Sequence, residues 1–568
     1  MIALDLETSG LNWRKDRIIG IATYNGQDAI FSQLLPDALT IYDFVLHNAK
    51  FDLKFLRHNG CSLSGRIDDT MLMSYVLNPE REGGHSLANL TKTILGRDHY
   101  EISDLLGKGK TKRRMEDLTF EELAEKSKMD VKDTYDLFFA LKEQMTPDLW
   151  RLYEKIELKL MLALVDIEMR GIDLDVKYLQ QLEQETRQEM AQALRQVRKW
   201  PHINYNSPKQ VGDLLYKKLK LPKCKVTDKG QPSTDTETLG QLAHPFAKQL
   251  IAYRDVKKRL STYVEPLLEE ANTNAGKLFP NFNQALTATG RLSSSNPINL
   301  QNIPTRSESG RKIRGAIIPT TNKILVEADY AQIEPRLMAH FSNDNNLIKL
   351  FRQEMDLYTG VVQEVLYGGL QAKEKEAKEK RALGKLLFLA MGYGAQPKKL
   401  VKAAKISGVT ISEQEAQDFI DKASCTYSTL FQFKENVVQK ARREGKVTTI
   451  CGRVRYFPKM NDPDRWVRME QERQAFNTLI QGSAADLMKI ALIKLYEAKF
   501  KLLLTVHDSV LIEIPSLDGA DLAVSDPLFE QRYIDYIEQI MESVGSKLRV
   551  PLKVETTIQD RWGHNNAI

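Results

Sequence analysis

The chain has 568 residues and a mass of 64.9 kDa, with 42% hydrophobic residues, 27% charged residues and a formal net charge of +6. These values exclude a disordered chain, a collagen-like fibre and a small disulfide scaffold, and the length predicts three or four packed units of roughly 150 residues. The four cysteines form no C-x-x-C pair, and no apolar run reaches the ~20 residues of a membrane span. We therefore expect a cytoplasmic protein without a membrane segment, whose small basic excess permits a polyanionic partner.

Short β-rich runs begin the chain, long amphipathic helices follow, and a mixed pattern returns after about residue 280. Strands are expected at 2–6, 18–24, 41–47, 323–328 and 502–514, and helices at 53–58, 118–142, 151–170, 174–198 and 245–272. A break at Met145-Thr146-Pro147-Asp148 interrupts this order. It separates a predicted α/β domain, residues 1–147, from the remainder, residues 148–568.

Carboxylates gather in the first domain. Asp5 and Glu7 lie two residues apart on the first predicted strand, so both side chains leave the same face of the sheet. An isolated pair of this kind is most often solvated, but this strand has apolar neighbours, and bare carboxylates are costly to bury. Asp52 follows, and Asp133 lies on the last predicted helix of the domain. Four such groups could hold two metal ions ~4 Å apart, which activate a water and stabilise the leaving oxygen of a phosphodiester.

Two aspartates stand out in the C-terminal part. Asp329 ends the run KILVEA, and Asp508 lies within LLLTVHDSVLIEI, which reads as one strand. A lone aspartate at a strand end is most often a cap, whereas an acid inside an apolar strand requires a charged partner or a metal. Paired from two strands, Asp329 and Asp508 could hold the cations that phosphoryl transfer to a 3′-hydroxyl needs.

Between these aspartates, two predicted helices carry chemistry-bearing residues at four-residue steps, each step advancing only ~40° around the helix. The first set is Arg381, Lys385, Leu389 and Tyr393, and the second is Arg473, Asn477 and Gln481. The first combination suits a triphosphate beside a base-stacking surface, with a solvated helix as the alternative. The second suits hydrogen bonds to base edges and sugars, although a buried packing network would show the same pattern.

Ordered motifs make the chain similar to the family A DNA polymerases, the family of bacterial DNA polymerase I and its phage relatives. The motifs are TATGRLSSSNPINLQNIP, DYAQIEPR, RALGKLLFLAMGYG, GRVRYFP, ERQAFNTLIQGSAAD and VHDSV. Upstream, DLET, NAKFD, DTMLMSYVL and KDTYDL resemble the DEDD 3′-to-5′ proofreading exonucleases. The resemblance implies an RNase H-like α/β exonuclease domain followed by a right-hand polymerase. Its thumb would span about 150–280, its palm about 281–344 and 436–568, and its fingers about 345–435.

The resemblance also implies roles for individual residues. Asp5, Glu7, Asp52 and Asp133 would be metal ligands of the exonuclease, and Asp329 and Asp508 those of the polymerase, with two Mg²⁺ ions at each site and Mn²⁺ as an alternative. Arg381 and Lys385 would contact the triphosphate, Tyr393 would pack at the insertion site, Glu334 would block a ribose 2′-hydroxyl, and Gln332 and Leu389 would complete the nucleotide-binding set. The residues implied to line the DNA are Arg291, Asn299, Gln301, Asn302, Arg336, Arg473, Asn477, Gln481 and His507.

Three positions depart from the family pattern. Relatives carry Tyr or His four residues before the last exonuclease aspartate, where this sequence has Met129, and a thioether cannot hold or deprotonate a water. Ser509 stands at the third palm carboxylate, and Glu513 is ~13 Å along the strand, too far to replace it. Leu389 stands where relatives carry Phe or Tyr. We expect a slow exonuclease, a polymerase that remains active with altered metal preference, and altered discrimination between deoxy and dideoxy nucleotides.

The motifs together predict a template-directed DNA polymerase with a weakened 3′-to-5′ exonuclease, acting on primer-template DNA and deoxynucleoside triphosphates in DNA replication. The alternatives are an exonuclease whose polymerase half only grips DNA, a single-subunit RNA polymerase, which Glu334 argues against, and a non-catalytic DNA-binding module, which would need no carboxylates. Because the chain starts at the first exonuclease strand, we expect no 5′-nuclease domain and a phage or bacterial origin. We also expect a monomer, with a helicase and a primase as possible replisome partners.

Overall fold

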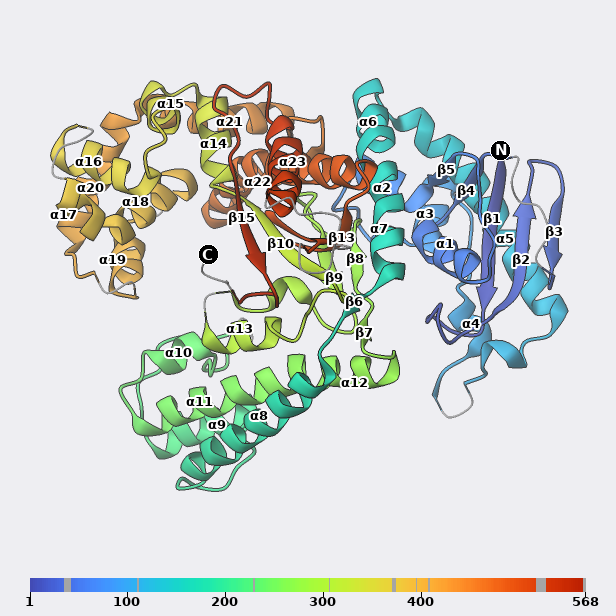
Figure 1. The fold of residues 1–568 in the computed structure, drawn as a ribbon, viewed down its shortest axis with the longest axis horizontal. Coiled ribbons are helices and arrows are strands. Elements are labelled where there is room, and N and C mark those ends of the chain that lie inside the picture. Colours follow the sequence, from blue (N-terminus) through green and yellow to red (C-terminus); the bar gives the residue numbers. More distant parts are fainter. Residues whose placement is uncertain are drawn as a thin grey trace.

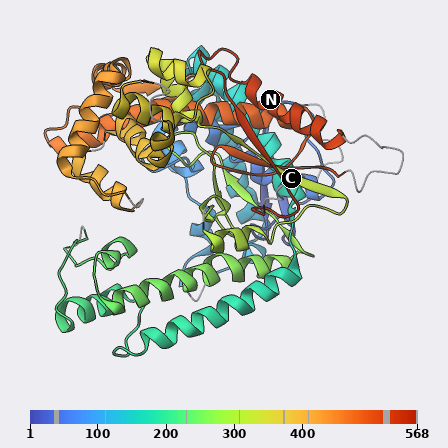
Figure 2. The same ribbon diagram turned by 60° about the vertical axis from the view of Figure 1, so that its left-hand side comes forward.

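The computed structural model describes residues 1–34, 42–109, 112–227, 230–305, 307–369, 374–394, 396–406, 409–516 and 528–564. A four-stranded sheet lies at the centre, between an α/β unit that includes the N-terminus and a group of short helices on the opposite side (Figure 1). A pair of long helices extends below the central sheet, and Figure 2 shows this pair projecting from the rest of the chain. Within the described ranges, no helix is both long and apolar enough to cross a membrane.

The N-terminal unit is built on a five-stranded sheet of order β3-β2-β1-β4-β5, with β1 at its centre. The strands are β1 (Ile2–Thr8), β2 (Ile18–Tyr24), β3 (Ala29–Ser32), β4 (Phe44–Leu46) and β5 (Ile67–Asp69). β1 runs antiparallel to β2 and parallel to β4. Leu4 and Leu6 are buried in the core, so alternation along the strand directs Asp5 and Glu7 to the other face, in the middle of the sheet.

One long helix, α5 (Phe120–Gln144), packs on β1, β2 and β3 and agrees with the helix predicted at 118–142. It begins at a capping box in which the Thr119 hydroxyl accepts a hydrogen bond from the Glu122 N–H and the Glu122 carboxylate accepts one from the Thr119 N–H. The remaining helices of the unit are α1 (Ala49–His58), α2 (Thr70–Leu77), α3 (Leu87–Leu90) and α4 (Ile102–Leu106), with a π-helical turn at Thr91–Leu95 and a 3₁₀ turn at Met115–Asp117.

The helix predicted at 151–170 consists of three segments: α6 (Pro147–Leu152), a π-helical turn (Tyr153–Glu157) and α7 (Leu158–Arg170). The Thr146 hydroxyl caps the first of them, and Pro147 occupies its first position, where a missing N–H costs nothing. The turn widens the backbone spiral and directs Glu157 into the protein interior, where the residue has no exposed surface.

The projecting pair of helices is formed by α8 (Val176–Val197) and α11 (Pro245–Arg259), which agree with the helices predicted from residues 174 and 245. α11 continues through a π-helical turn (Leu260–Val264) into α12 (Glu265–Thr273). The polar stretch between them contains the short helices α9 (Pro208–Gly212) and α10 (Thr236–Gly240) and a π-helical turn at Asp213–Lys218. The outer part of the pair has its own apolar core, separate from the main one, that includes Val197, Phe246 and Leu250.

The central sheet is antiparallel, with strand order β13-β14-β10-β15. Its strands are β10 (Lys323–Tyr330), β13 (Lys501–Val506), β14 (Ser509–Pro515) and β15 (Val554–Gln559). The prediction of a single strand over 502–514 was wrong, because His507 and Asp508 form a two-residue turn between β13 and β14, with φ of 56° at His507. Such turns usually contain Gly or Asn, so the pair His507-Asp508 did not indicate a turn. The helices α22 (Arg465–Glu497) and α23 (Phe529–Ser543) contact this sheet.

The group of short helices follows β10 and returns to the sheet through α21. Its members are α14 (Ile333–Ser342), α15 (Asn345–Arg352), α16 (Leu357–Tyr367), α17 (Glu374–Glu379), α18 (Arg381–Tyr393), α19 (Pro397–Ile406), α20 (Glu413–Thr426) and α21 (Ser428–Glu444). The remaining elements are β6 (Ile172–Asp173), β7 (Lys277–Leu278), β8 (Asn281–Asn283), β9 (Ser293–Ser295), a 3₁₀ turn (Leu300–Asn302), α13 (Glu308–Arg314), β11 (Lys446–Thr448) and β12 (Val454–Tyr456).

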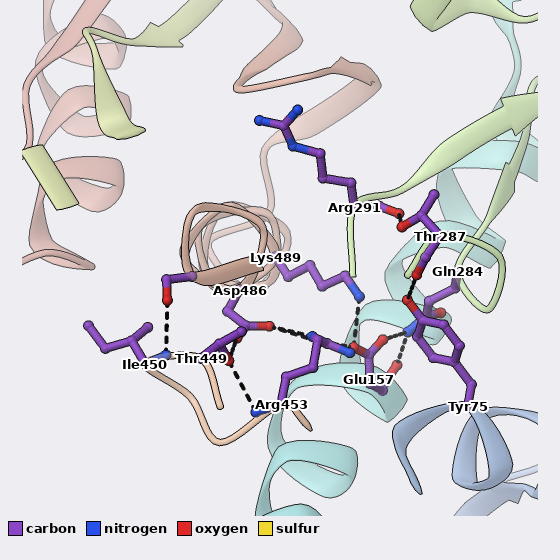
Figure 3. A network of polar contacts seen from close by, with 11 residues as sticks. Tyr75, Glu157, Gln284, Thr287, Arg291, Thr449, Ile450, Arg453, Asp486 and Lys489 are labelled. Atoms are coloured by element: carbon purple, nitrogen blue, oxygen red, sulfur yellow. Dashed lines mark hydrogen bonds and ion pairs between the residues drawn. The ribbon is translucent and has the colours of Figure 1, made fainter. Parts of the chain in front are cut away.

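A buried ionic network joins the π-helical turn after α6 to α22 (Figure 3). The Arg453 guanidinium forms ion pairs with Glu157 and with Asp486, the latter at 2.8 Å, and the Lys489 ammonium lies 2.7 Å from Glu157. Two carboxylates and two cations balance in charge, as burial of ionic groups requires. Burial alone would raise the pKa of Glu157, but Lys489 and Arg453 outweigh it and lower that pKa to about 2.

The N-terminal unit contacts the same region. The Tyr75 hydroxyl of α2 donates a hydrogen bond of 2.6 Å to the carbonyl oxygen of Thr287, and the Thr287 hydroxyl donates one of 2.7 Å to the carbonyl oxygen of Arg291 (Figure 3). Glu80 accepts hydrogen bonds of 2.7 and 3.0 Å from the Arg455 guanidinium. Two side chains of the N-terminal unit therefore contact segments next to the central sheet, and one of these segments carries Arg291.

Candidate active sites in the central sheet and the N-terminal unit

The two aspartates predicted as a pair lie at the same end of the central sheet. Asp329 is the penultimate residue of β10, in register with Ser509 on β14 and with Glu555 on β15, and Asp508 occupies the β13–β14 turn. The Tyr330 N–H donates a hydrogen bond of 3.2 Å to the Asp508 carbonyl oxygen, which holds the turn against β10. Both aspartates line a cavity of about 1100 Å³ on the face of the sheet.

This end of the sheet carries excess negative charge. Desolvation, followed by the charges of Asp508, Glu327 and Glu555, raises the pKa of Asp329 to about 7. Desolvation also raises the pKa of Asp508, an effect that Arg291 opposes. A cation between the two aspartates would relieve this repulsion, and oxygen ligands of this kind suit Mg²⁺ or Mn²⁺. The residues present therefore fit a divalent ion.

Ser509 does not supply a carboxylate, and Glu513 does not replace it. The Ser509 hydroxyl is buried and donates a hydrogen bond of 3.0 Å to the carbonyl oxygen of Val506. Glu513 forms an ion pair with Lys501 and accepts a hydrogen bond of 2.8 Å from the Thr320 N–H, as expected for a residue far along the strand. Glu327 and Glu555, which also line the large cavity, were not predicted from the sequence. The strand period of two, applied backwards from Asp329, would have indicated Glu327.

A smaller cavity of about 160 Å³ lies between the sheet and the short helices, and residues predicted to bind nucleotide line it. These are Gln332, Glu334 and Leu389; the predicted metal ligand Asp508 lines the same cavity, with Tyr358 and Phe388 as further lining residues. Gln332 precedes α14 with a left-handed φ of 58°, which turns the chain so that Glu334 lies in the first helical turn. Leu389, 39% exposed, comes from α18 on the opposite side. The structure therefore brings together side chains that are distant in sequence.

Arg291 connects the two cavities electrostatically. Its guanidinium Nη2 lies 2.6 Å from Glu334 Oε1 and 3.7 Å from Asp508 Oδ1. One cation therefore lies between the carboxylate that would exclude a 2′-hydroxyl and one of the two candidate metal ligands.

The predicted phosphate-binding face of α18 lies along Tyr358. The Arg381 guanidinium forms an ion pair of 2.9 Å with Asp356, and its central carbon lies 5.1 Å from the centre of the Tyr358 ring. The Lys385 ammonium lies 6.0 Å from the same ring. Tyr358 was not predicted from the sequence, because its helix, α16, carries no recognisable motif. The side chain of Tyr393 lies outside the described part of the structure.

The three residues predicted on α22 to contact DNA differ in their solvent exposure. Arg473 is exposed, and Asn477 and Gln481 are half-buried. Among the described residues, the Asn477 side-chain oxygen has no hydrogen-bond partner although the atom is buried. An unsatisfied buried acceptor is costly, so this atom is suited to a ligand donor.

The residues predicted near the primer end have different environments. Gln301 and His507 line a third, narrower cavity together with Arg291 and Asp508. The Asn299 side-chain oxygen caps the 3₁₀ turn by accepting a hydrogen bond of 3.1 Å from the Gln301 N–H, so the fold itself uses this atom. Asn302 accepts a hydrogen bond of 2.9 Å from the Tyr263 hydroxyl through its backbone carbonyl.

Arg336 was predicted to bind DNA, and the structure contradicts this. The residue is 8% exposed, and its guanidinium donates hydrogen bonds of 2.8 and 2.7 Å to the carbonyl oxygens of Ala331 and Pro551. The guanidinium also lies 4.7 Å from the centre of the Phe351 ring. Arg336 lies on the buried side of α14 and stabilises the junction between this helix and the sheet.

In the N-terminal unit, the helix α5 contributes Asp130 and not Asp133 to the carboxylate cluster. One oxygen each of Asp5, Glu7 and Asp130 lie within 4.8 Å of one another. Asp133 accepts hydrogen bonds from Arg97 at 3.3 Å and from His99 at 2.8 Å. The prediction of Asp133 was wrong because Asp130, three residues earlier and only about 60° away around the helix, is the residue whose carboxylate reaches Asp5 and Glu7, whereas Arg97 and His99 bind Asp133.

Asp52 completes the surroundings of this cluster. Its carboxylate accepts a hydrogen bond of 3.2 Å from the Leu6 N–H, next to Asp5 and Glu7. Burial, with the charges of Glu7, Asp52 and Asp130, raises the pKa of Asp5 well above its ordinary value. Burial likewise raises the pKa of Asp52. Three acidic residues therefore cluster at the centre of the sheet, and Asp52 lies close enough for its charge to act on Asp5.

The residue four positions before the last aspartate of this cluster is Lys126, not Met129. Its ammonium forms an ion pair with Asp130 and lies 3.3 Å from His99 Nε2, and the Lys126 side chain is 4% exposed. A divalent ion held by Asp130 would be next to this ammonium. Charges of +2 and +1 that are about 4 Å apart repel each other by about 8 kcal/mol at an effective dielectric constant of about 20. The residues present therefore do not fit two divalent ions.

A four-stranded antiparallel sheet with paired aspartates at one end, flanked by short helices and a projecting helical pair, defines a right-hand polymerase fold. Residues 176–564 match the family model "DNA polymerase family A", and residues 1–146 match the model "3'-5' exonuclease". The chain belongs to DNA polymerase family A and carries an N-terminal 3′-to-5′ exonuclease domain. The fold class predicted from the sequence is confirmed.

The chain is similar to bacterial DNA polymerases I. It is 35% identical over 614 residues to that of Synechocystis sp. and 33% identical over 593 residues to that of Geobacillus stearothermophilus, matching 99% of this chain in both. It spans 59% and 64% of the length of these relatives. A solved structure described as the "POL domain of Pol1 from M. smegmatis complex with DNA primer-template and dNTP" superposes with a TM-score of 0.83 at 28% identity, covering 99% of this chain and 95% of that one. A phage origin stays a prediction.

Proposed function

We propose that the chain is a template-directed DNA polymerase that adds deoxynucleotides to the 3′ end of a primer. The observation that carries the proposal is that Asp329 and Asp508 lie together at one end of the central sheet, and that Asp508 also lines the small cavity that Glu334 and Leu389 line. The solved structure to which the chain is similar is described with primer-template DNA and a deoxynucleotide, which supports the same substrates for this chain. In the terms of this fold, the central sheet is the palm and the short helices at about 345–435 are the fingers. The thumb is the segment at about 150–280 that contains the projecting pair α8 and α11.

Asp329 and Asp508 would hold divalent ions, Mg²⁺ or Mn²⁺, which when bound lower the pKa of the primer 3′-hydroxyl and stabilise the leaving pyrophosphate. Arg381 must release Asp356 to reach a phosphate, and Lys385 lies one helical turn away on the same face. An arginine and a lysine on one face can share the charge of a triphosphate, since the guanidinium binds in a planar fork and the ammonium as a point charge. Arg473, Asn477, Gln481 and Gln301 are proposed as contacts to the primer-template duplex.

Glu334 would select deoxynucleotides, because its carboxylate lies at the wall of the small cavity, where Arg291 fixes its orientation at 2.6 Å. A 2′-hydroxyl placed against this carboxylate would meet steric and desolvation costs. Leu389 contributes an aliphatic surface to the opposite wall.

Primer extension with matched variants tests this function. Asp329→Asn removes a charge at the proposed metal site, whereas Asp560→Asn removes one on the wall of the same large cavity, at the far end of β15. We expect the first variant to lose extension by 10³-fold or more, on the order expected for loss of a metal ligand, while it still binds primer-template DNA, and the second to retain extension. Equal extension by the two variants would contradict the proposal. If Asp329→Asn also lost DNA binding, its defect would lie in binding and the proposed catalytic role of Asp329 would be wrong.

A further inference from the structure

The N-terminal carboxylate cluster contains its own cation. Lys126 is buried on α5, and its ammonium forms an ion pair with Asp130, one of the three acids whose oxygens lie within 4.8 Å of one another. The charge of Lys126 also acts on Asp5 and Glu7. A buried ammonium is costly unless carboxylates surround it, and this cluster provides them.

The surroundings of Lys126 hold the ammonium in this position. His99 Nδ1 lies 2.8 Å from Asp133, and His99 Nε2 lies 3.3 Å from the Lys126 ammonium and 3.3 Å from Asp130. Asp133 is in turn bound by Arg97. The Lys126 ammonium also lies 5.6 Å from the centre of the Tyr100 ring. This arrangement explains why Asp133 is buried although it does not join the carboxylate cluster.

We propose that the Lys126 ammonium takes the place of one of the two divalent ions in the N-terminal carboxylate cluster, so that this domain is stable without metal and does not support two-metal hydrolysis of DNA 3′ ends. An ammonium has three donors and no lone pair, so Lys126 cannot accept the proton of an attacking water while it is charged. The domain then contributes to the protein through its contacts with the palm, which include the Tyr75–Thr287 hydrogen bond. The inference does not depend on the proposed polymerase function, because the two carboxylate clusters are separate.

Counting bound Mn²⁺ ions tests the proposal. An Asp329→Ala/Asp508→Ala background silences the palm, and the electron paramagnetic resonance signal of free Mn²⁺ then reports binding to the rest of the chain. Adding Asp5→Asn identifies the ions that belong to the N-terminal cluster. We expect that cluster to bind at most one ion in the background. Two ions lost on Asp5→Asn would overturn the proposal, and this result needs no substitution of Lys126.

Substitution of Lys126 adds a second test in the same background. Lys126→Met should raise the number of bound ions by one, and Mn²⁺ should then raise the melting temperature relative to chelator by more than it does in the background. Lys132→Met, on the exposed face of the same helix, is the matched control and should change neither quantity. Lys126→Arg keeps the positive charge and should bind no additional ion. An unchanged ion count in a folded Lys126→Met variant, or an increase in Lys126→Arg, would overturn the proposal.

Discussion

The guanidinium of Arg291 lies 2.6 Å from the carboxylate of Glu334, so the residue proposed to exclude ribonucleotides is ion-paired before any nucleotide is bound. The same guanidinium lies 3.7 Å from Asp508. Because one cation lies close to both carboxylates, nucleotide selection and metal binding share an electrostatic partner. Most substitutions at this junction should therefore alter more than one property.

Replacing Glu334 by Ala should relax selection against ribonucleotides. The carboxylate would no longer meet the 2′-hydroxyl, and the kcat/KM ratio of deoxy- to ribonucleotide should fall on the order of tenfold or more, the size of a typical steric or polar discrimination. The measurement is single-nucleotide incorporation with both nucleotides. Glu327→Ala, which removes a carboxylate from the larger cavity instead, is the control and should leave the ratio unchanged. An unchanged ratio in Glu334→Ala would contradict the assigned role.

Replacing Ser509 by Glu should lower the Mg²⁺ concentration needed for half-maximal primer extension. The new carboxylate would stand in register with Asp329, where it adds a ligand to a site that now has two aspartates. Titrating Mg²⁺ during extension measures this, with Ser509→Gln as a control of similar size and no charge. If the Glu and Gln variants share one Mg²⁺ requirement, the missing carboxylate does not matter to metal binding.

Replacing Leu389 by Phe should change discrimination between deoxy and dideoxy nucleotides. Leu389 lines the small cavity and is 39% exposed, so an aromatic ring there would pack beside the sugar of an incoming nucleotide. Competition between the two nucleotides in a chain-termination assay gives the ratio directly. Leu389→Met, which keeps an aliphatic side chain, should behave as the wild type. If wild type, Leu389→Phe and Leu389→Met all show the same ratio of deoxy to dideoxy incorporation, Leu389 does not lie beside the nucleotide sugar.

Replacing Glu157 by Gln should destabilise the protein by about 3–5 kcal/mol, because it leaves Arg453 and Lys489 buried without their shared carboxylate. The folded-state pKa of Glu157 is about 2, below its ordinary value of 4.5, so its stabilising contribution is complete above pH 4.5 and is lost as pH falls toward 2.

Urea unfolding at neutral pH and at acid pH checks both parts of this prediction. The wild type should lose stability over that acid range more steeply than Glu157→Gln. Glu157→Gln/Lys489→Met, which removes a carboxylate and a cation together, should recover part of the loss. If Glu157→Gln is as stable as the wild type, the ionic network contributes little to the free energy of unfolding.

The spacing of sequence motifs predicted many of the site residues, and each wrong prediction has a physical reason. Asp5 and Glu7 lie on one face of β1, as strand alternation predicts, and Asp329 lies near the end of β10. Asp508 was predicted inside a strand and lies in the turn between β13 and β14. Asp133 was wrong because two aspartates three residues apart on one helix cannot be distinguished without the neighbouring strand. Arg336 was wrong because its motif does not reveal which side of α14 faces the core.

Other features depend on contacts that the sequence does not display. The turn at His507 and Asp508 lacks the residues that usually mark a hairpin, so two strands read as one. Tyr358 and Glu555 reach their cavities from elements whose own sequences carry no recognisable motif. The role proposed for Lys126 depends on its ion pair with Asp130, a cluster member that the sequence motif does not distinguish from Asp133.

Extension of an end-labelled primer on a longer template by the purified chain, with Mg²⁺ and the four deoxynucleotides, shows directly whether Asp329 and Asp508 form a polymerase active site. We predict that the primer grows to the end of the template, that Asp329→Asn does not extend it, and that wild-type protein without nucleotides leaves its length nearly unchanged. A primer that never grows under these conditions, or that shortens whether or not nucleotides are present, would contradict the assignment of polymerase activity to Asp329 and Asp508.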